Sequence, residues 1–412
     1  MSLATAFSQL VGDDTKVRFV AYDNSSAGPL DAPATVELRS PLGLRYMASA
    51  PGDLGLARAF VTGQLEVHGD LHLALRELVD GVTKHVPIAD RIAVARMLGR
   101  SLLHKPPRPP EEAPPPRLRG LRHSKARDAA AISHHYDVSN TFYSYILGPT
   151  MAYTCAVYEK PDSSLEEAQT EKFDLVCRKL GLQQGMRLLD VGCGWGGMVK
   201  HAVQNYGVTA IGVTLSRAQA DWGASSIEEA GLSSVASIRY QDYRDVTERG
   251  FDAVSSIGLT EHIGLANLPA YFRFLASRLR EEGRLLNHCI TRSTGKEQAK
   301  AGGFIDRYIF PDGELEGPGT ILSAMNDNGF ELRHEENLRE HYAMTLRDWS
   351  VNLDRNWTEA VGEVGPRKAR IWRLYLAASR VGFETNRIQL HQALGVKIGP
   401  SHVSGMPLRP DW

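Results

Sequence analysis

A run of glycines after a single carboxylate is the feature of this sequence best suited to chemistry. Residues 188–197 read Leu-Leu-Asp-Val-Gly-Cys-Gly-Trp-Gly-Gly, which indicates a buried strand and a tight turn before a helix over Met198–Tyr206. Glycine lets the backbone approach a ligand where a Cβ would clash, and the free N–H groups of the helix would face that ligand. The run predicts a site for a nucleotide-like cofactor, although turns of this kind also occur for structural reasons alone.

The next apolar segment narrows the choice of cofactor. A nicotinamide dinucleotide site expects an acidic residue about 20 positions beyond the turn, to bind the ribose hydroxyls. Gly212–Thr214 occupy that region, so no carboxylate is present there. Thr214 and Gln219 offer neutral hydrogen-bonding groups, and Asp190 places a negative charge near the pocket. The pattern favours a cationic cofactor such as S-adenosylmethionine, with a nicotinamide oxidoreductase as the alternative.

Alternating elements must position these residues. From about residue 130, helix-length segments separate five strand candidates: Arg187–Val191, Thr209–Val213, Ser237–Tyr240, Phe251–Ile257 and Gly283–Cys289. This alternation predicts an α/β fold with a doubly wound parallel sheet, in which ligands bind beyond the carboxyl ends of the strands. Residues that could bind a ligand or take part in catalysis fall at those ends: Gly192 to Gly196, Thr214, Asp242, Tyr243, Glu261, His262 and His288. Taken singly, the Glu-His pair is also typical of a helix cap and His288 of a core histidine.

The chain of 412 residues is long enough for more than one core. Residues 1–85 predict a smaller N-terminal α/β domain, residues 86–129 a basic amphipathic helix and a proline-rich basic linker, and residues 130–412 the catalytic domain. Within the N-terminal domain we expect strands at Val17–Tyr22, Thr35–Leu38 and Leu44–Met47, and helices near Leu54–Val61 and Leu71–Leu78.

Composition limits the partners and the compartment. The formal net charge of −1 gives no reason to expect nucleic acid as a partner. The four cysteines form no CxxC pair, and no apolar stretch approaches the roughly 20 residues that span a bilayer. We therefore expect a cytoplasmic protein whose membrane contact is peripheral. The basic residues of 117–127 are either a solvated face or a site for anionic headgroups at the inner membrane surface.

Six motifs, separated along the chain, together resemble a known family. They are His135–Tyr143, Met151–Tyr158, Asp190–Gly197, Gly212–Ser216, Ser256–Gly264 and Tyr308–Gly313. Together they resemble the cyclopropane-fatty-acyl-phospholipid synthase and mycolic-acid methyltransferase family over roughly residues 130–395. Residues 59–65 and 70–71 look like the accessory domain of the branch that acts on phospholipids. The resemblance implies a class I, Rossmann-like methyltransferase domain and an unsaturated membrane phospholipid as substrate.

The resemblance also implies roles for individual residues. S-adenosylmethionine would be bound by Tyr153, Thr154, Asp190, Gly192, Gly194, Thr214, Leu215, Gln219, Asp242 and Tyr243. A bicarbonate ion beside the reactive methyl would be held by Cys155, Glu261, His288, Ile290 and Tyr342, with Cys155 and Ile290 acting largely through the backbone. Tyr136 and Tyr308 are candidates for binding the substrate, and no metal is expected. Thr154 stands where the family more often has serine, which keeps the hydroxyl.

The reaction implied is methyl transfer to an acyl double bond, followed by closure of a cyclopropane. The alternative outcome is a methylene branch, which a partner reductase would convert to a methyl branch. Leu259, Thr260 and Asn287 depart from the family pattern, and we expect these changes to affect the acyl pocket and the product. A catalytically silent lipid-binding protein is a third interpretation, and a homo-oligomer is compatible with the sequence.

Overall fold

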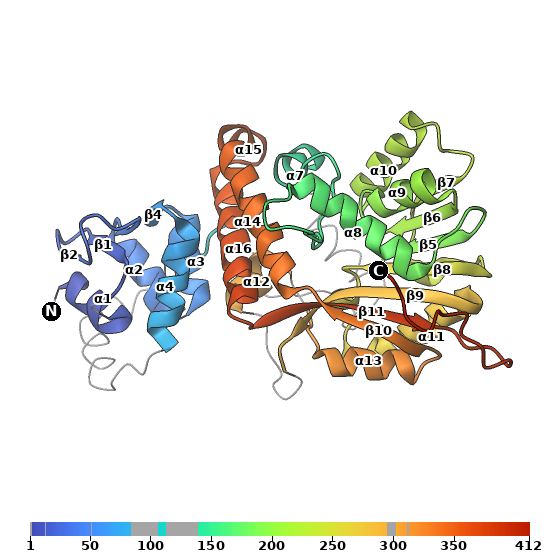
Figure 1. The fold of residues 1–412 in the computed structure, drawn as a ribbon. Helices are drawn as coiled ribbons and strands as arrows, with labels where there is room; N and C mark the ends of the chain where they lie inside the picture. Colours follow the sequence, from blue (N-terminus) through green and yellow to red (C-terminus); the bar gives the residue numbers. More distant parts are fainter. Residues whose placement is uncertain are drawn as a thin grey trace. The chain divides into compact units, whose positions relative to one another are not determined.

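The computed structural model describes residues 2–12, 14–50, 52–83, 106–112, 139–294, 302–310 and 313–412. Contacts divide the chain into two compact units. The larger unit is built on a seven-stranded mixed sheet in the order β10-β11-β9-β8-β5-β6-β7 (Figure 1). Its strands are β5 (Arg187–Val191), β6 (Thr209–Thr214), β7 (Ala236–Tyr240), β8 (Phe251–Ile257), β9 (Leu279–Arg292), β10 (Glu331–Asn337) and β11 (Ile388–Val396).

Five of these strands are parallel neighbours, as the alternating pattern predicted: β7, β6, β5, β8 and β9. Both remaining strands pair antiparallel, β11 with β9 and β10 with β11. The sequence analysis did not anticipate this antiparallel edge. The seven-stranded α/β sheet confirms the fold class, with the addition that the sheet is mixed.

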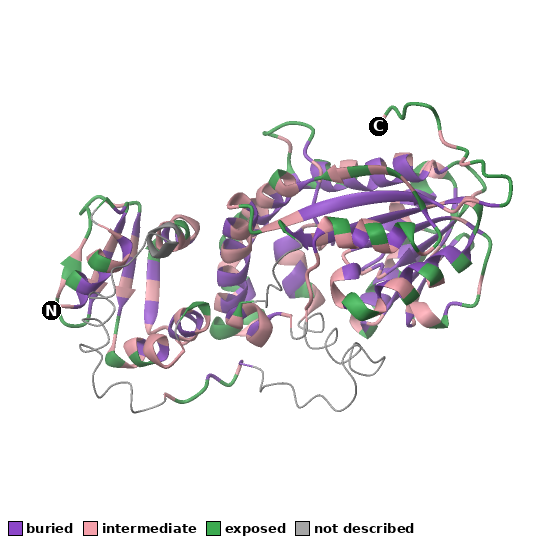
Figure 2. Ribbon diagram, turned by 90° about the horizontal axis from the view of Figure 1, so that it is seen from below, coloured by how far each residue is buried: buried purple, intermediate pink, exposed green. Residues whose placement is uncertain are grey.

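Helices cover both faces of the sheet. One buried cluster joins the sheet to α8 (Leu165–Leu180), α9 (Gly197–Tyr206) and α10 (Arg217–Glu229). A second joins the other face to α11 (Leu268–Arg278) and α13 (Pro318–Asn326). Figure 2 shows the central strands of this sheet buried along most of their length, whereas edge strand β10 has no buried residue. The remaining elements of the unit are α7 (Asn140–Leu147), α14 (Arg339–Arg355) and the short turns η2 (Tyr243–Asp245), η3 (Thr260–His262) and η4 (Leu265–Asn267).

Helix α8 illustrates how local sequence defines an element that later carries site residues. Ser164 caps its first turn, and the Glu167 side chain accepts from the Ser164 backbone, which completes a capping box. Gly181 ends the helix in the left-handed conformation that favours glycine. Lys172 and Lys179 lie seven residues apart, and therefore on one side of the helix, and both are buried. The inner side of α8 thus carries two amines into the protein.

The smaller unit contains a four-stranded sheet in the order β2-β1-β3-β4. Its strands are β1 (Val17–Ala21), β2 (Ser26–Ala27), β3 (Ala34–Leu38) and β4 (Leu65–Gly69), and its N-terminal helices are α1 (Leu3–Val11), α2 (Pro41–Ser49), α3 (Asp53–Val61) and α4 (Leu71–Thr83). The expected strand at Leu44–Met47 is wrong, because these residues lie inside α2. Ser40 caps that helix by accepting from two backbone N–H groups, and Pro41 occupies its first position, where its fixed φ favours a helix.

The smaller unit also takes in later parts of the chain. Residues 302–311, with α12 (Gly303–Tyr308), and residues 357–381, with α15 (Trp357–Val364) and most of α16 (Pro366–Glu384), group with residues 1–116. Side-chain bonds account for this grouping: Arg370 of α16 donates to both Glu66 oxygens, and the Phe304 N–H donates to Asp53. Sequence order alone had placed residues 302–311 and 357–381 in the catalytic domain; the domain boundaries at residues 85 and 129 stay a prediction.

Candidate active site

The glycine turn has the predicted strand, turn and helix geometry. Strand β5 ends at Val191, and α9 begins at Gly197. Gly192 has φ +75° and Gly196 φ +83°, both in the region that side chains rarely adopt. A Cβ on Gly196 would lie 2.9 Å from Ile238 Cδ1, and one on Gly192 would lie 3.1 Å from Leu259 Cβ. The positive φ angles therefore favour glycine at these two positions, and the space beside both is tight.

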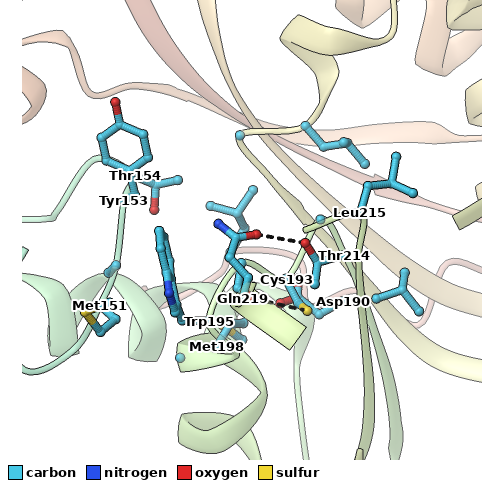
Figure 3. Close-up of a pocket in the computed structure, with 18 of the residues that line it drawn as sticks. Met151, Tyr153, Thr154, Asp190, Cys193, Trp195, Met198, Thr214, Leu215 and Gln219 are labelled. Atoms are coloured by element: carbon cyan, nitrogen blue, oxygen red, sulfur yellow. Dashed lines mark hydrogen bonds between the residues drawn. The ribbon is translucent and has the colours of Figure 1, made fainter. Parts of the chain in front are cut away.

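A cavity of about 890 Å³, partly open to solvent, adjoins this turn. Nine of the ten predicted cofactor residues line it: Tyr153, Thr154, Asp190, Gly192, Gly194, Thr214, Leu215, Gln219 and Tyr243. Figure 3 shows the side chains of Thr154, Trp195, Gln219 and Thr214 around the hollow. Residues from four parallel strand ends and from the 151–154 segment thus meet in one place.

Hydrogen bonds fix several of the lining side chains. The Thr214 hydroxyl donates to Gln219 Oε1 at 2.8 Å, which joins the end of β6 to α10 (Figure 3). Ser216 caps α10 by accepting from the Gln219 N–H. The Trp195 indole N–H donates to Asn140 Oδ1 at 2.8 Å, which holds the ring at the cavity wall. These bonds within the protein hold the lining side chains in place.

Asp190 and Lys172 both line the cavity, and both are buried. Burial raises the pKa of Asp190 to about 7, against the opposing effects of a Ser255 hydrogen bond and of Lys172. Burial also lowers the pKa of Lys172 to about 7, against the attraction of Cys155 and Asp190. The Lys172 ammonium donates to the Thr154 hydroxyl at 3.1 Å and lies 3.7 Å from the Phe173 ring centroid. A cation entering this cavity favours the ionised carboxyl group and the neutral amine.

Aromatic rings connect the cavity to Tyr342. Tyr143 lies 4.9 Å from Trp195 and 5.7 Å from Tyr153, measured between ring centroids. The Tyr153 ring is 5.3 Å from that of Trp349, which in turn lies edge-on to Tyr342 at 6.1 Å. These rings come from the α7 and α14 helices and from two loops, so they form a continuous apolar wall. Such a wall excludes water and presents π faces to a developing cation.

Glu261, one of the residues predicted to hold bicarbonate, lies beside a second, smaller cavity. Glu261 and Ile290 line this space of about 220 Å³, together with Thr260, Gly264, Leu265, Leu268, Glu314, Glu316 and Ile321. The Ile290 N–H donates to Glu261 Oε1 at 2.7 Å, whereas Oε2 is buried without a partner. Burial raises the pKa of Glu261 to about 7, despite the Ile290 bond that lowers it. The next residue, His262, lines the cofactor cavity, so η3 borders both spaces.

His288 and Cys155 are completely buried. His288 Nδ1 contacts Gln392 Nε2 at 3.2 Å, and its Nε2 has no partner. Burial lowers the pKa of His288 well below its usual value, so the ring is neutral at pH 7. The Cys155 thiol lies 3.8 Å from the Leu338 carbonyl oxygen, and burial raises its pKa. Cys155 is therefore a neutral thiol at pH 7.

Five of the predicted site residues that the structure describes line neither of the two cavities: Cys155, Asp242, His288, Tyr308 and Tyr342. The Asp242 carboxylate accepts from the backbone and the guanidinium of Arg244, and Asp242 does not line the cavity that its neighbours Gln241 and Tyr243 line. Tyr308 belongs to the smaller unit, where its hydroxyl lies 3.4 Å from Glu112. Tyr136 lies outside the described residues, as do the basic segment 117–127 and the helix expected at residues 87–103.

Other lining residues were missed by the sequence analysis. Trp195 stands between two glycines of the turn, and His262 follows Glu261, so position in the motif was the available signal for both. Lys172 gave no signal, because a lysine on an amphipathic helix normally faces solvent. Thr260 and Asn287, which both depart from the family pattern, are bonded to each other: the Thr260 hydroxyl donates to Asn287 Oδ1 at 2.6 Å. The two departures therefore form one buried unit.

Comparisons with known proteins agree with this geometry. The family model described as mycolic acid cyclopropane synthetase matches residues 123–393. The chain belongs to this family. A probable fatty acid methyltransferase of Mycobacterium tuberculosis is 54% identical over 404 residues, which cover 96% of this chain and 94% of that protein. The cyclopropane-fatty-acyl-phospholipid synthase of Escherichia coli strain K12 is 35% identical over 66% of this chain and 69% of its own length.

A solved structure supports the same family and cofactor. The mycolic acid cyclopropane synthase CmaA1, complexed with SAH and CTAB, superimposes with a TM-score of 0.62 at 33% identity, covering 65% of this chain and 98% of that one. The chain is therefore an S-adenosylmethionine-dependent C-methyltransferase of the cyclopropane synthetase family. The cavity residues fit the cofactor, because they combine a glycine turn, neutral hydrogen-bonding groups and a carboxyl group able to face a sulfonium. The oxidoreductase and silent-protein alternatives are not supported.

Proposed function

We propose that this methyltransferase acts on the double bond of an unsaturated acyl chain in a membrane phospholipid and forms a cyclopropane ring. The observation that carries the proposal is the Glu261 carboxyl group, which is buried and retains one unpartnered oxygen. Its neighbour His262 lines the cofactor cavity. Ring formation requires a proton acceptor close to the transferred methyl group and away from bulk water. A carboxyl group one residue from the cavity wall supports such chemistry.

The chemistry is demanding because an isolated alkene is a poor nucleophile. S-adenosylmethionine supplies an electrophilic methyl group when it is bound. The π electrons of the alkene form a new carbon–carbon bond as the carbon–sulfur bond breaks, and positive charge develops on the other alkene carbon. A proton then leaves the new methyl group, and the electrons of that C–H bond close the ring. Alignment of alkene and methyl group in a dry channel is the main catalytic task.

Residues of this chain would perform three of the necessary tasks. The glycine turn and the Thr214–Gln219 pair orient the cofactor. The rings of Tyr153 and Trp349 exclude water and stabilise positive charge through their π faces. The ionised form of Glu261 accepts a proton or orients the group that does so. With a pKa of about 7, this carboxyl group is a stronger base than an ordinary glutamate and is still partly ionised at neutral pH.

We extend the proposal to bicarbonate as a bound anion. Two buried atoms without a hydrogen-bond partner among the described residues could bind this anion. Glu261 Oε2 can accept a hydrogen bond, and His288 Nε2 can donate one when it carries the proton. Bicarbonate offers one O–H group and acceptor oxygens, so it matches both atoms. It would supply a base that needs no bulk water. Tyr342 and the backbone of Cys155 and Ile290 are the further residues that we expect around it.

The names of the relatives support the substrate and the product. The relative from Escherichia coli is a cyclopropane-fatty-acyl-phospholipid synthase, and the superimposed structure is a cyclopropane synthase. A methylene-branched product with a partner reductase is not favoured. No helix in the described ranges is long and apolar enough to cross a membrane. We propose that the protein reaches its lipid by peripheral contact, for which the basic segment 117–127 is the candidate.

The experiment is incubation of the purified protein with methyl-deuterated S-adenosylmethionine and vesicles of unsaturated phospholipid. Mass spectrometry of the acyl chains, before and after mild hydrogenation, reports both transfer and product. A ring survives hydrogenation and retains two deuterium atoms, because one leaves with the departing proton. Saturated vesicles and Glu261→Gln serve as controls that lack the alkene or the base. Absence of deuterium from the acyl chains would contradict the phospholipid substrate. A deuterium-labelled acyl chain that gains two hydrogens on hydrogenation would contradict ring closure.

A further inference from the structure

His288 lies at one end of a buried series of hydrogen bonds that reaches the protein surface. Its Nδ1 is 3.2 Å from Gln392 Nε2, and Gln392 Oε1 accepts from Lys179 Nζ at 2.7 Å. Lys179 Nζ also donates to Glu336 Oε2 at 2.5 Å. The side chains of His288, Gln392 and Lys179 are fully buried or nearly so, whereas that of Glu336 is 38% exposed. Four elements contribute: strands β9 and β11, helix α8 and edge strand β10.

The order of these bonds determines which atom of each group faces the next. An ammonium group has three donors and no acceptor, so the Gln392 atom that faces Lys179 must be the carbonyl oxygen. Burial lowers the pKa of Lys179, and the carboxylate of Glu336 opposes this effect by favouring the charged form of the amine. The other end of the Gln392 amide is then its NH₂ group, and this group faces His288 Nδ1. An NH₂ group donates, so Nδ1 must accept.

A neutral imidazole carries one proton, on either nitrogen. The neutral form applies here because burial and the charges of Lys172 and Lys179 lower the pKa of His288 well below its usual value. With Nδ1 accepting, the proton resides on Nε2, the ring nitrogen that has no partner within the protein. The register of the sheet holds the pair together, since His288 on β9 stands opposite Gln392 on β11.

We propose that Lys179 and Gln392 are positioning residues that hold His288 as its Nε2–H tautomer, so that it presents a hydrogen-bond donor to an anionic ligand. Lys179 fixes the orientation of the Gln392 amide, and the amide fixes the proton on the ring. Neither residue lines the cofactor cavity. The part of this inference that concerns an anion rests on the proposed function, whereas the tautomer itself does not.

Nitrogen-15 NMR of the full chain with labelled histidine tests the tautomer directly. Protonated and unprotonated ring nitrogens have well-separated chemical shifts, and the signals of His288 are those lost in a His288→Gln variant. We expect the wild-type Nδ1 to be unprotonated and Nε2 protonated from pH 6 to pH 8. A wild-type ring protonated at Nδ1, alone or at both nitrogens, would overturn the proposal without the use of any variant.

Two variants test the cause. Gln392→Glu keeps the shape and the bond from Lys179 but replaces the donor with an acceptor, so we expect a proton on Nδ1. Lys179→Met releases the amide, so we expect both tautomers. Gln389→Glu makes the same change on the same strand, where the side chain bonds Asn386, and should leave the His288 signals unchanged. An unprotonated Nδ1 in folded Gln392→Glu, or one tautomer in Lys179→Met, would contradict the assignment.

Activity provides a separate measurement. In Gln392→Glu we expect kcat for methyl transfer to fall about ten- to hundredfold, the effect of losing one hydrogen bond to a charged group. The affinity for S-adenosylhomocysteine should be unchanged, since residue 392 does not line that cavity. A tautomer that shifts as expected while kcat stays at the wild-type value would overturn the anion-donor role. Absence of methyl transfer in the wild type would instead contradict the proposed substrate and leave the tautomer assignment intact.

Discussion

Two buried ionisable groups of the cofactor cavity predict a proton linked to cofactor binding. Asp190 and Lys172 each have a pKa of about 7, and burial is the main cause of both shifts. At pH 7 the pair therefore carries on the order of one proton that can dissociate. A sulfonium in the cavity favours the ionised carboxyl group and the neutral amine, and that state has lost this proton. We expect S-adenosylmethionine to release up to about one proton as it binds at pH 7.

The sign of the pH dependence follows from this release. Free protein holds more protons than the complex, so affinity rises with pH, by up to about tenfold per unit around pH 7. S-adenosylhomocysteine has no sulfonium charge and should release little or no proton. Calorimetric titration in two buffers of different ionisation enthalpy measures the number of protons released. Dissociation constants from pH 6 to pH 8 give the same quantity as a slope.

Variants separate the contributions of the two groups. In Asp190→Asn, Lys172 loses the carboxylate that raises its pKa, so it is already neutral at pH 7 and proton release should fall toward zero. In Lys172→Met, Asp190 loses the ammonium that lowers its pKa, so the variant should still release about one proton. Asp252→Asn is the matched control, since Asp252 bonds Arg187 and Arg280 outside the cavity. Equal proton release for both ligands, or undiminished release in Asp190→Asn, would refute this reasoning.

Three further predictions follow from single residues. Glu261→Gln should abolish detectable methyl transfer yet bind S-adenosylhomocysteine normally by calorimetry, because the side chain lines a different cavity; retained turnover would exclude its role as base. Glu112→Ala removes the buried partner of Arg58 and should lower the free energy of unfolding, measured by urea denaturation, by about 3 kcal/mol. Glu111→Ala removes the partner of Arg367 in a more exposed ion pair and should change that free energy by less than about 1 kcal/mol. Gly196→Ala places a Cβ 2.9 Å from Ile238 at positive φ and should weaken cofactor affinity at least about tenfold; wild-type affinity would mean that the turn adapts.

The parallel part of the sheet was predictable because its strands are short apolar runs between helical segments. Arg187–Val191 and Phe251–Ile257 have the bounds that the pattern predicted. The N-terminal error at Leu44–Met47 arose because a short apolar run does not distinguish a strand from a helix. The Ser40-Pro41 capping signal, which does distinguish them, was not used. Strand β10 was missed for another reason: its charged residues match an exposed edge and have no apolar alternation.

Some residues of the site could be predicted from the sequence, and others could not. Glycines and strand-end polar residues could be predicted, since local backbone geometry demands them and the fold brings the strand ends together. Lys172 and Lys179 could not, because burial of an amine depends on acceptors supplied by distant segments, such as Glu336 and Gln392. The bond between Thr260 and Asn287 likewise joins residues that are 27 positions apart in the chain. Sequence spacing gives the candidates, and only tertiary contacts decide which of them interact.

The position of β11 has a consequence for how the protein is made. Strand β11 is hydrogen-bonded between β9 and β10, although it is the last strand to be synthesised. Until it emerges from the ribosome, β9 has one unpaired edge and His288 lacks the amide of Gln392. An unpaired apolar strand edge promotes association between chains. A nascent chain that stops before residue 388 would therefore leave His288 without its Gln392 partner and be prone to aggregate, and insertion of β11 between β9 and β10 completes this part of the sheet.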